Sequence, residues 1–434
     1  MSSAIATVRV RLQSTGLAAG IFLLAALPLI ILNYDHGRAF SDQVRYHYPA
    51  ILHFARGGGI ADYPSATTPG YHVLMAAVAM LAPGSERALK LAGLALSLLL
   101  VGLMADQVAR RTASVVVTAV TLLPMLLSIY ILPAGVWLLP DNLAWLTVAA
   151  ALILCLRFED GWRWYLMMAA TLVAAVLVRQ SNLWLCALAP LAAFAPGEGA
   201  AGPPGRGRWL RAGLACAALA PACLVLLLFV ATWHGLTPPS FAQRHTDLNF
   251  SAWPFLLCVL GAYGVFYLPL LAGPLRVRLR AGMLPRRALI GAIAAALVAL
   301  VAPSDWSPEA GRASGLWNLA RVGPVIGHHS LTITLAAAVG GATCAAFAEL
   351  LPAAAARILG VAAAAFAAAQ TSNHFVYERY YAGFAFILIL LALALALAQA
   401  GVHCSARPQR WTLAFPLAFG VANAAVLAVG LIGS

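Results

Sequence analysis

The sequence predicts an all-α polytopic membrane protein. Of its 434 residues, 62% are hydrophobic and only 9% are charged, and the mean hydropathy is +0.88, well outside the range of soluble domains. Apolar runs of roughly 17 to 22 residues recur along the chain, and each could cross about 30 Å of hydrocarbon as a helix. The ten-residue alternation typical of a membrane β-barrel is missing from the sequence. The net charge of +13 therefore indicates membrane orientation rather than nucleic-acid binding.

We expect a bundle of about 13 transmembrane helices. The first apolar run, 16–32, has a basic flank but no convincing cleavage site, so we expect a retained helix and not a signal peptide. The later runs are 87–105, 113–131, 141–157, 163–178, 181–196, 209–233, 251–272, 288–303, 330–350, 356–372, 380–400 and 411–431.

The apolar run 68–82 is ambiguous, and the distribution of arginine decides how we interpret it. If the run lies at the interface, 17 of the 27 basic residues but only 5 of the 14 acidic ones fall on the inner side, as the positive-inside rule requires. Nine of the ten histidines then lie on the outer side. We therefore expect juxtamembrane helices in the first loop and a working surface on the outer face.

The chain is expected to form a single integral membrane domain, 1–434. Within it, 33–86 is the outer catalytic loop, and the Pro/Gly-rich segment 195–208 is a cytoplasmic linker between two halves of the bundle. Lysine occurs once and alanine is abundant, which favours a bacterial inner membrane with the site facing the periplasm. In a eukaryote the same face would be the lumen of the endoplasmic reticulum.

The polar stretch 35–72 contains the first candidate residues. Ser41 can cap a short amphipathic helix, which would place Asp42 at its N-terminus, where the helix dipole favours an ionised carboxylate. Such a carboxylate at the mouth of a membrane cavity could act as a general base towards a hydroxyl. Alternatively, it only complements the dipole. His47 lies on the same predicted helix, and Thr68 precedes the interfacial run.

Further polar residues recur at the outer ends of later spans. Asp141 is either a helix N-cap or a second carboxylate of the same cavity. Arg179, in a polar hairpin between two spans, carries a guanidinium that suits bidentate phosphate binding, although it could also be a snorkelling side chain in a plain polar turn. Glu378 and Arg379 stand where a chain re-enters the membrane and must pair locally or meet a ligand. The remaining candidates are Gln180 and Asn182 in the hairpin of Arg179, Arg312 and Arg321 in a late outer loop, and Tyr380.

In order along the chain, these motifs resemble those of the GT-C membrane glycosyltransferases, most closely the dolichyl-phosphate-glucose α-1,2-glucosyltransferases. Asp42…His47-x-Pro49 is similar to Asp-Glu-x-x-His-x-Pro. The other matches are Thr67-Thr68-Pro69-Gly70 to Thr-Thr-x-Pro-Gly, Arg179-Gln180-Ser181-Asn182 to Arg-Gln-Thr-Asn, Glu309 to Arg321 to Ala-Asp-Asn-Arg…Trp-Lys-Arg, and Glu378-Arg379-Tyr380 to Glu-Phe-Arg-Tyr.

The sequence departs from this pattern at three points. Gln43 replaces the acid beside Asp42, one extra residue separates Asp42 from His47, and Glu378 lacks the intervening Phe. The missing second acid disfavours a two-carboxylate metal site in this loop. We expect no cofactor, although a divalent metal stays compatible with the remaining carboxylates.

The resemblance implies an inverting transfer of a hexose, glucose-like in the family, from a polyprenyl-phosphate donor to a lipid-linked or surface glycan. Asp42 would be the base, and Arg179, Arg379, Arg312 or Arg321 would stabilise the leaving phosphate. Two rivals stay open. A transporter or flippase of lipid-linked saccharides would carry charges in the middle of its spans, and a non-catalytic assembly subunit would tolerate changes in the Asp42 loop.

Overall fold

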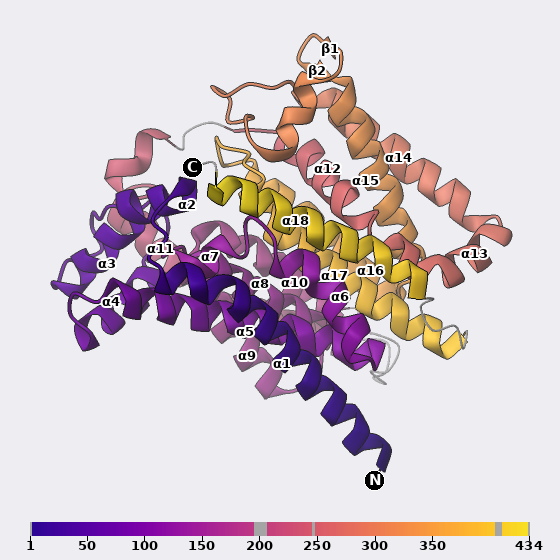
Figure 1. Cartoon of the computed structure of the whole chain (residues 1–434), viewed down its shortest axis with the longest axis horizontal. Helices are drawn as coiled ribbons and strands as arrows, with labels where there is room; N and C mark the ends of the chain where they lie inside the picture. Colours follow the sequence, from indigo (N-terminus) through magenta and orange to yellow (C-terminus); the bar gives the residue numbers. More distant parts are fainter. Residues whose placement is uncertain (1, 195–205, 245–247, 404–409, 433–434) are drawn as a thin grey trace.

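The structure is a computed structural model that describes residues 2–194, 206–244, 248–403 and 410–432, of which the helices make up most: the chain is 78% helical (Figure 1). The helices are α1 (Ser2–Ile31), α2 (Gly37–Asp42), α3 (Tyr48–Ala55), α4 (Gly70–Leu81), α5 (Glu86–Thr112), α6 (Val115–Leu126), α7 (Pro133–Val136), α8 (Asp141–Leu156), α9 (Trp162–Val178), α10 (Leu188–Phe194), α11 (Arg206–Trp233), α12 (Ala252–Gly264), α13 (Ala272–Arg280), α14 (Met283–Val301), α15 (Leu331–Glu349), α16 (Ala353–Gln370), α17 (Arg379–His403) and α18 (Ala414–Ile432). A short antiparallel pair, β1 (Val325–Ile326) and β2 (His329–Ser330), lies in the loop before α15.

The described residues contain eight helices long and apolar enough to cross a membrane, so the protein is a multi-pass membrane protein. A ninth span is added if α12 and the segment Leu268–Arg280, bent by 66° at their junction, count as one. The other expected spans correspond to shorter helices. For example, α8 and α9 have 16 and 17 residues, or about 24 to 26 Å at 1.5 Å per residue. The larger number of about 13 spans stays a prediction.

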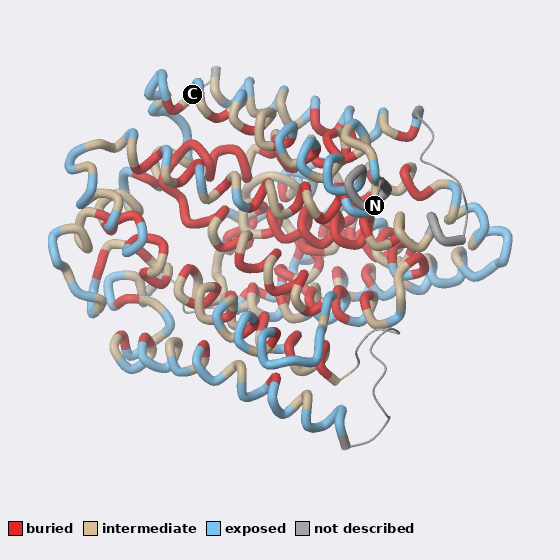
Figure 2. The backbone as a smooth tube through the Cα atoms, turned by 90° about the horizontal axis from the view of Figure 1, so that it is seen from below, coloured by how far each residue is buried: buried red, intermediate tan, exposed pale blue. Residues whose placement is uncertain are grey.

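Helix α17 forms the centre of the bundle. In the span Arg379–Gln399, 83% of the apolar stretch is buried, against 17 to 28% for the peripheral spans in α1, α11 and α18. Figure 2 shows the buried backbone concentrated in the middle of the molecule. Because Gly383 has no side chain, the indole of Trp145 from α8 lies directly against α17, where an added Cβ would meet it at 2.3 Å.

Glycines also determine the packing of α12, α14 and α15. A Cβ on Gly340 would lie 1.9 Å from the backbone oxygen of Leu257, and one on Gly341 would lie 2.1 Å from that of Gly291. Such backbone approach needs small residues, which is a common basis of helix association in lipid.

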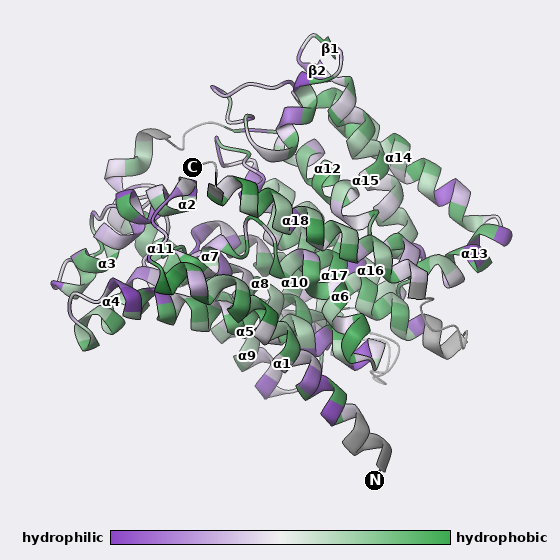
Figure 3. Ribbon diagram, in the orientation of Figure 1, coloured by the Kyte–Doolittle hydropathy of each residue, from purple (hydrophilic) through white to green (hydrophobic). Residues whose placement is uncertain are grey.

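Polar residues gather at the helix ends, as Figure 3 shows by hydropathy. Helices α1 and α5 are antiparallel, since Arg11 pairs with Asp106 at one end and the Arg87 guanidinium donates to Ile31 O at the other, 3.4 Å away. Residues expected on the inner and outer sides thus lie at opposite ends of α5. The predicted linker 195–208 falls mostly on 195–205, outside the described residues.

The prediction that Ser41 caps a helix starting at Asp42 is wrong. Helix α2 begins at Gly37 with His36 at the N-cap position, and Asp42 is its last residue. The helical path then continues through the π-helical turn η1 (Gln43–His47) into α3. Asp42 therefore has no helix N-terminus beside it. The run 68–82 forms α4, whose 12 residues are too short to cross the membrane at 1.5 Å per residue.

Candidate active site

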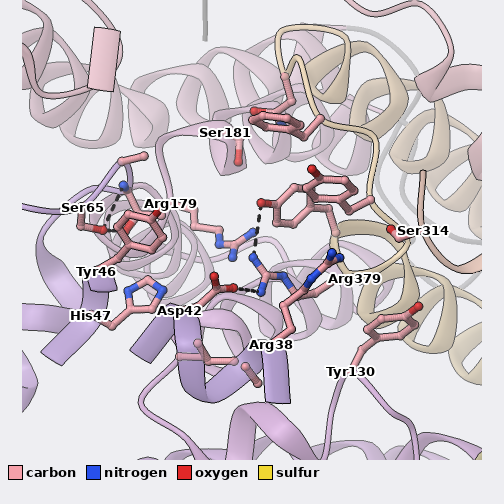
Figure 4. Close-up of a pocket in the computed structure, with 18 of the residues that line it drawn as sticks. Arg38, Asp42, Tyr46, His47, Ser65, Tyr130, Arg179, Ser181, Ser314 and Arg379 are labelled. Carbon is pink, nitrogen blue, oxygen red and sulfur yellow. Dashed lines mark hydrogen bonds and ion pairs between the residues drawn. The ribbon is translucent and has the colours of Figure 1, made fainter. Parts of the chain in front are cut away.

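A cavity of about 1620 Å³ opens between the first loop, the ends of α9 and α17, and helices α11, α16 and α18. Six of the residues singled out in the sequence line it, although they come from distant parts of the chain: Asp42, His47, Arg179, Gln180, Arg379 and Tyr380. Figure 4 shows Asp42, Arg38, Arg179 and Arg379 directed towards one another at its polar end. Candidate residues from three of the sequence motifs thus meet at one site.

Asp42 and Arg379 form an ion pair between the first loop and the start of α17. The guanidinium of Arg379 lies 5.2 Å from the ring centroid of Tyr380 and also donates to the Tyr380 hydroxyl at 3.4 Å. The guanidinium of Arg179 lies 5.5 Å from the same ring. Tyr380 therefore contacts both arginines that face Asp42, with its negative ring face available to either cation.

Asp141 holds Arg179 in place from outside the cavity. It is the first residue of α8 and makes no side-chain cap hydrogen bond, because the N-cap position belongs to Pro140. Its carboxylate accepts from Arg179 Nη2 at 2.9 Å, and both side chains are largely buried. The Nε of Arg179 has no hydrogen-bond partner among the described residues, so this guanidinium has an unused donor.

The π-helical turn aligns Asp42 with His47. The N–H of Tyr48 donates to the oxygen of Gln43, the five-residue spacing of a π-helix. In such a turn, residues i and i+5 occupy the relation that i and i+4 have in an α-helix. The extra residue between Asp42 and His47 is thereby absorbed, and both side chains line the cavity.

Gln43 fastens this turn to its surroundings. It is 1% exposed, donates to the Glu86 carboxylate at 2.7 Å and accepts from the N–H of Leu138 at 2.9 Å. Glu86 in turn pairs with Lys90, which also pairs with Asp35, both at 3.0 Å. Gln43 thus faces away from the cavity, in a position that supports Asp42 and offers no ligand atom to it.

His47 faces the cavity and contacts His72, with Nδ1 of His47 3.0 Å from Nε2 of His72. Burial, and then the positive charges of Arg379 and Arg179, lower the pKa of His47 to about 3. Burial also lowers the pKa of His72. Both imidazoles are therefore neutral at physiological pH.

Two predicted ligand residues hold the loops together instead. Thr68 is fully buried, and its hydroxyl donates to Val176 O at 2.6 Å. Asn182 is 4% exposed and its amide donates to Ala175 O at 3.2 Å, where it satisfies a carbonyl near the end of α9. Neither lines the cavity. Gln180 does, but its amide also accepts from Thr68 N and donates to Ala66 O, so it mainly connects the two loops.

Glu378 lies behind the cavity wall. Its carboxylate accepts from the Tyr263 hydroxyl at 2.6 Å and from Leu316 N at 2.7 Å. Burial raises the pKa of Glu378, an effect that these hydrogen bonds oppose. Adjacent helical residues point in different directions, and Glu378 and Arg379 accordingly have separate partners. The proposed local pair does not form.

Arg312 and Arg321 are not cavity residues. Arg312 is held by Asp305 through the carboxylate and the backbone oxygen, the latter at 2.9 Å. The guanidinium of Arg321 lies 4.9 Å from the ring centroid of Trp306. Both belong to the segment that leads into β1 and β2 and packs over α12 and α15, so the structure does not place them with the other candidate arginines, and contact with the leaving group stays a prediction.

Arg38, Arg45, Tyr46 and Tyr377 also line the cavity, and the two arginines were missed in the sequence. Arg38 lies 5.9 Å from the ring centroid of Tyr377, and no carboxylate pairs with it in the described part of the chain. Its position four residues before Asp42 was the available signal, because residues at that spacing share a helix face. Arg38 thus adds a positive charge beside the neutral Asp42–Arg379 ion pair. This end of the cavity therefore has an excess of positive charge.

Within the described ranges, no group of three His, Cys, Asp or Glu side chains has metal-binding geometry. No protein-family model matches the chain, and no curated protein matches its sequence.

Proposed function

We propose that the protein is an inverting membrane glycosyltransferase of the GT-C type, which transfers a hexose from a polyprenyl-phosphate donor to a hydroxyl of a lipid-linked or surface glycan. The observation that carries the proposal is that one cavity is lined by the Asp42 carboxylate, which pairs with Arg379, and by the guanidinium groups of Arg38 and Arg179. A base and an anion site side by side are what a displacement of phosphate by a hydroxyl needs.

The chemistry follows from these positions. Asp42 accepts the proton of the acceptor hydroxyl while the oxygen of that hydroxyl forms a bond to the anomeric carbon of the sugar. The bond from that carbon to the phosphate oxygen breaks on the opposite face, and the electron pair leaves with the polyprenyl phosphate. The developing charge is stabilised by arginines already directed at it, an electrostatic effect that is strongest where water is scarce.

The walls of the cavity suit a lipid chain. Helix α11 contributes Leu226, α16 contributes Ala365 and Ala369, and α18 contributes Leu427. Spans α11 and α18 are among the least buried in the described bundle, so they face the bilayer. A donor with an anionic head and an apolar tail could therefore enter from the membrane with its phosphate at the arginines.

The proposal also includes the number of membrane spans and the side of the membrane that the cavity faces. The shorter helices α6, α8 and α9 and the segment from Gln180 to Phe194 would complete a bundle of about 13 spans. The cavity would face the periplasm of a bacterial inner membrane, or the lumen in a eukaryote. The clustering of charged pairs at helix ends favours this activity over a transport path through the middle of the spans.

Sugar transfer from a radiolabelled polyprenyl-phosphate hexose in proteoliposomes tests the proposal. Transfer is expected with the wild type and should fall by about 100- to 10,000-fold, the usual contribution of a general base, in Asp42→Asn. Asp62→Asn is the matched control, because Asp62 lies in the same loop and only accepts a hydrogen bond from the hydroxyl of the exposed Ser240. Movement of the lipid across the bilayer without transfer would instead support a flippase.

A further inference from the structure

His72 and His47 form a hydrogen-bonded pair beside the candidate base. His72 is fully buried in α4, and its Nε2 lies 3.0 Å from Nδ1 of His47. The two rings are nearly parallel, at 14°, with centroids 5.3 Å apart. Because His47 lines the cavity while His72 does not, the pair connects the wall of the site to the packed interior of the loop.

The interior side of His72 offers no hydrogen-bond partner. Tyr63 and Tyr71 contact its ring edge-on, with centroids 5.9 and 5.5 Å away. The Nδ1 of His72 has no partner among the described residues. Each neutral imidazole carries one ring proton. The ring that donates the shared hydrogen bond therefore determines on which nitrogen the other ring carries its proton.

Two arrangements exist. If His47 donates through Nδ1–H, His72 accepts at Nε2 and carries its one ring proton on Nδ1, so a buried N–H is left without an acceptor. If His72 donates through Nε2–H, its Nδ1 is a bare ring nitrogen, and His47 carries its proton on Nε2. Orphaned buried N–H groups are rare compared with under-satisfied acceptors, so the second arrangement is favoured.

We propose that His72 is a positioning residue that fixes His47 as the Nε2–H tautomer, so that His47 presents a neutral N–H donor to a sugar hydroxyl or phosphate oxygen in the cavity. The role in substrate binding rests on the proposed transferase function, whereas the tautomer does not. Figure 4 shows His47 on the same side of the site as Asp42 and Tyr46, where a bound sugar would lie next to the base.

The charged groups around His47 keep it neutral. Arg179 and Arg379 approach from the ends of α9 and α17, and His72 approaches from α4. Asp42 precedes it on the same helical face. A cation at His47 would meet the two guanidinium groups, so the imidazole binds an oxygen acceptor through hydrogen bonding and adds no charge to the site.

Solution or solid-state NMR of protein labelled with ¹⁵N-histidine in nanodiscs tests the tautomer directly. The His47 signals are assigned by their loss in His47→Gln. The expected result is an Nε2–H tautomer in the wild type, a mixture of tautomers in His72→Phe, and an unchanged spectrum in Tyr71→Phe, whose missing hydroxyl has no partner in the wild type. An Nδ1–H tautomer in the wild type overturns the proposal, whatever the transfer assay shows.

Kinetics test the consequence for binding. His72→Phe should raise KM for the sugar substrate by about twofold, because an equal mixture of tautomers leaves half of the protein with the Nε2–H donor, with a smaller change in kcat. In the His47→Gln background, whose amide keeps a donor without a tautomer, His72→Phe should have no further effect on KM. If His72→Phe does not fold, His72→Gln replaces it, because an amide can donate or accept and so also allows both tautomers. Equal KM effects in both backgrounds would show that His72 acts only in packing.

Discussion

Arg379 is paired with Asp42, 337 residues away in the sequence, so the proposed phosphate ligand neutralises the proposed base in the ligand-free protein. A donor phosphodiester that binds Arg379 competes with the Asp42 carboxylate for the same N–H groups. Donor binding would thus release Asp42 as it assembles the site. A water molecule that arrives without a donor meets a carboxylate already engaged by a cation.

Replacing Asp42 by Asn should separate binding from catalysis. The change removes the intramolecular competitor for Arg379 and leaves one more uncompensated positive charge, so the Kd for the polyprenyl-phosphate donor should fall by about three- to tenfold while transfer is lost. Fluorescence titration with a labelled donor measures the affinity. Weaker donor binding in Asp42→Asn than in the Asp62→Asn control would contradict the competition.

Arg38 should contribute to donor binding, although it belongs to none of the sequence motifs. Arg38→Gln removes a guanidinium that no carboxylate neutralises in the described structure, and hydrogen bonds to charged groups contribute about 1.5 to 3 kcal/mol. We expect Kd for the donor to rise by about 10- to 100-fold with an unchanged melting temperature. Arg321→Gln is the control, since Arg321 contacts Trp306 away from the cavity, and it should bind donor normally. Equal losses in both variants would indicate only a general effect of surface charge.

Gln43→Glu tests why an amide stands beside the base. The new carboxylate would face Glu86, to which Gln43 now donates at 2.7 Å, and two adjacent carboxylates, one of them at the buried position 43, repel each other unless one is protonated. The melting temperature should fall, with a loss of about 1 to 3 kcal/mol in unfolding free energy. Adding Glu86→Gln should recover most of it, because the amide can then donate to the new acid. Transfer that becomes dependent on a divalent metal in Gln43→Glu would contradict the assignment of this side chain to the packed interior.

Asp141→Asn should destabilise the protein, since it leaves the Arg179 guanidinium buried without its carboxylate. Breaking a buried ion pair from one side costs about 3 to 5 kcal/mol, and somewhat less where, as here, water reaches one partner. A thermal melt in detergent measures the loss. The double variant Asp141→Asn with Arg179→Gln should melt closer to the wild type but transfer poorly. Recovery of transfer together with stability would mean that Arg179 acts only structurally.

The membrane class and the meeting of the outer motifs could be predicted from sequence because both depend on simple patterns. Long apolar runs specify spans, and outer loops necessarily lie near one another. Asp42, Arg179 and Arg379 were found this way. The beginning of α2 was not, because Ser41 is as good an N-cap as any residue nearby, and only the tertiary arrangement starts the helix at Gly37.

The roles of individual polar residues were harder to predict, because they depend on partners. Arg312 could not be distinguished from Arg379 by residue type or by its expected outer side of the membrane, yet Asp305 holds one and Asp42 the other. Asn182 and Thr68 resemble ligand residues in a motif but satisfy backbone oxygens of α9. Conversely, Arg38 stands outside every motif and was missed for that reason.

The π-helical turn from Gln43 to His47 has a consequence for how relatives of this chain can be recognised. A π-helical turn places one more residue between two side chains than an α-helical turn does, and here it still leaves Asp42 and His47 on one wall of the cavity. A search for Asp and His at one fixed spacing would therefore miss such a pair. Descent is better traced at this site by superposing the two flanking helices and asking which side chains share the cavity wall.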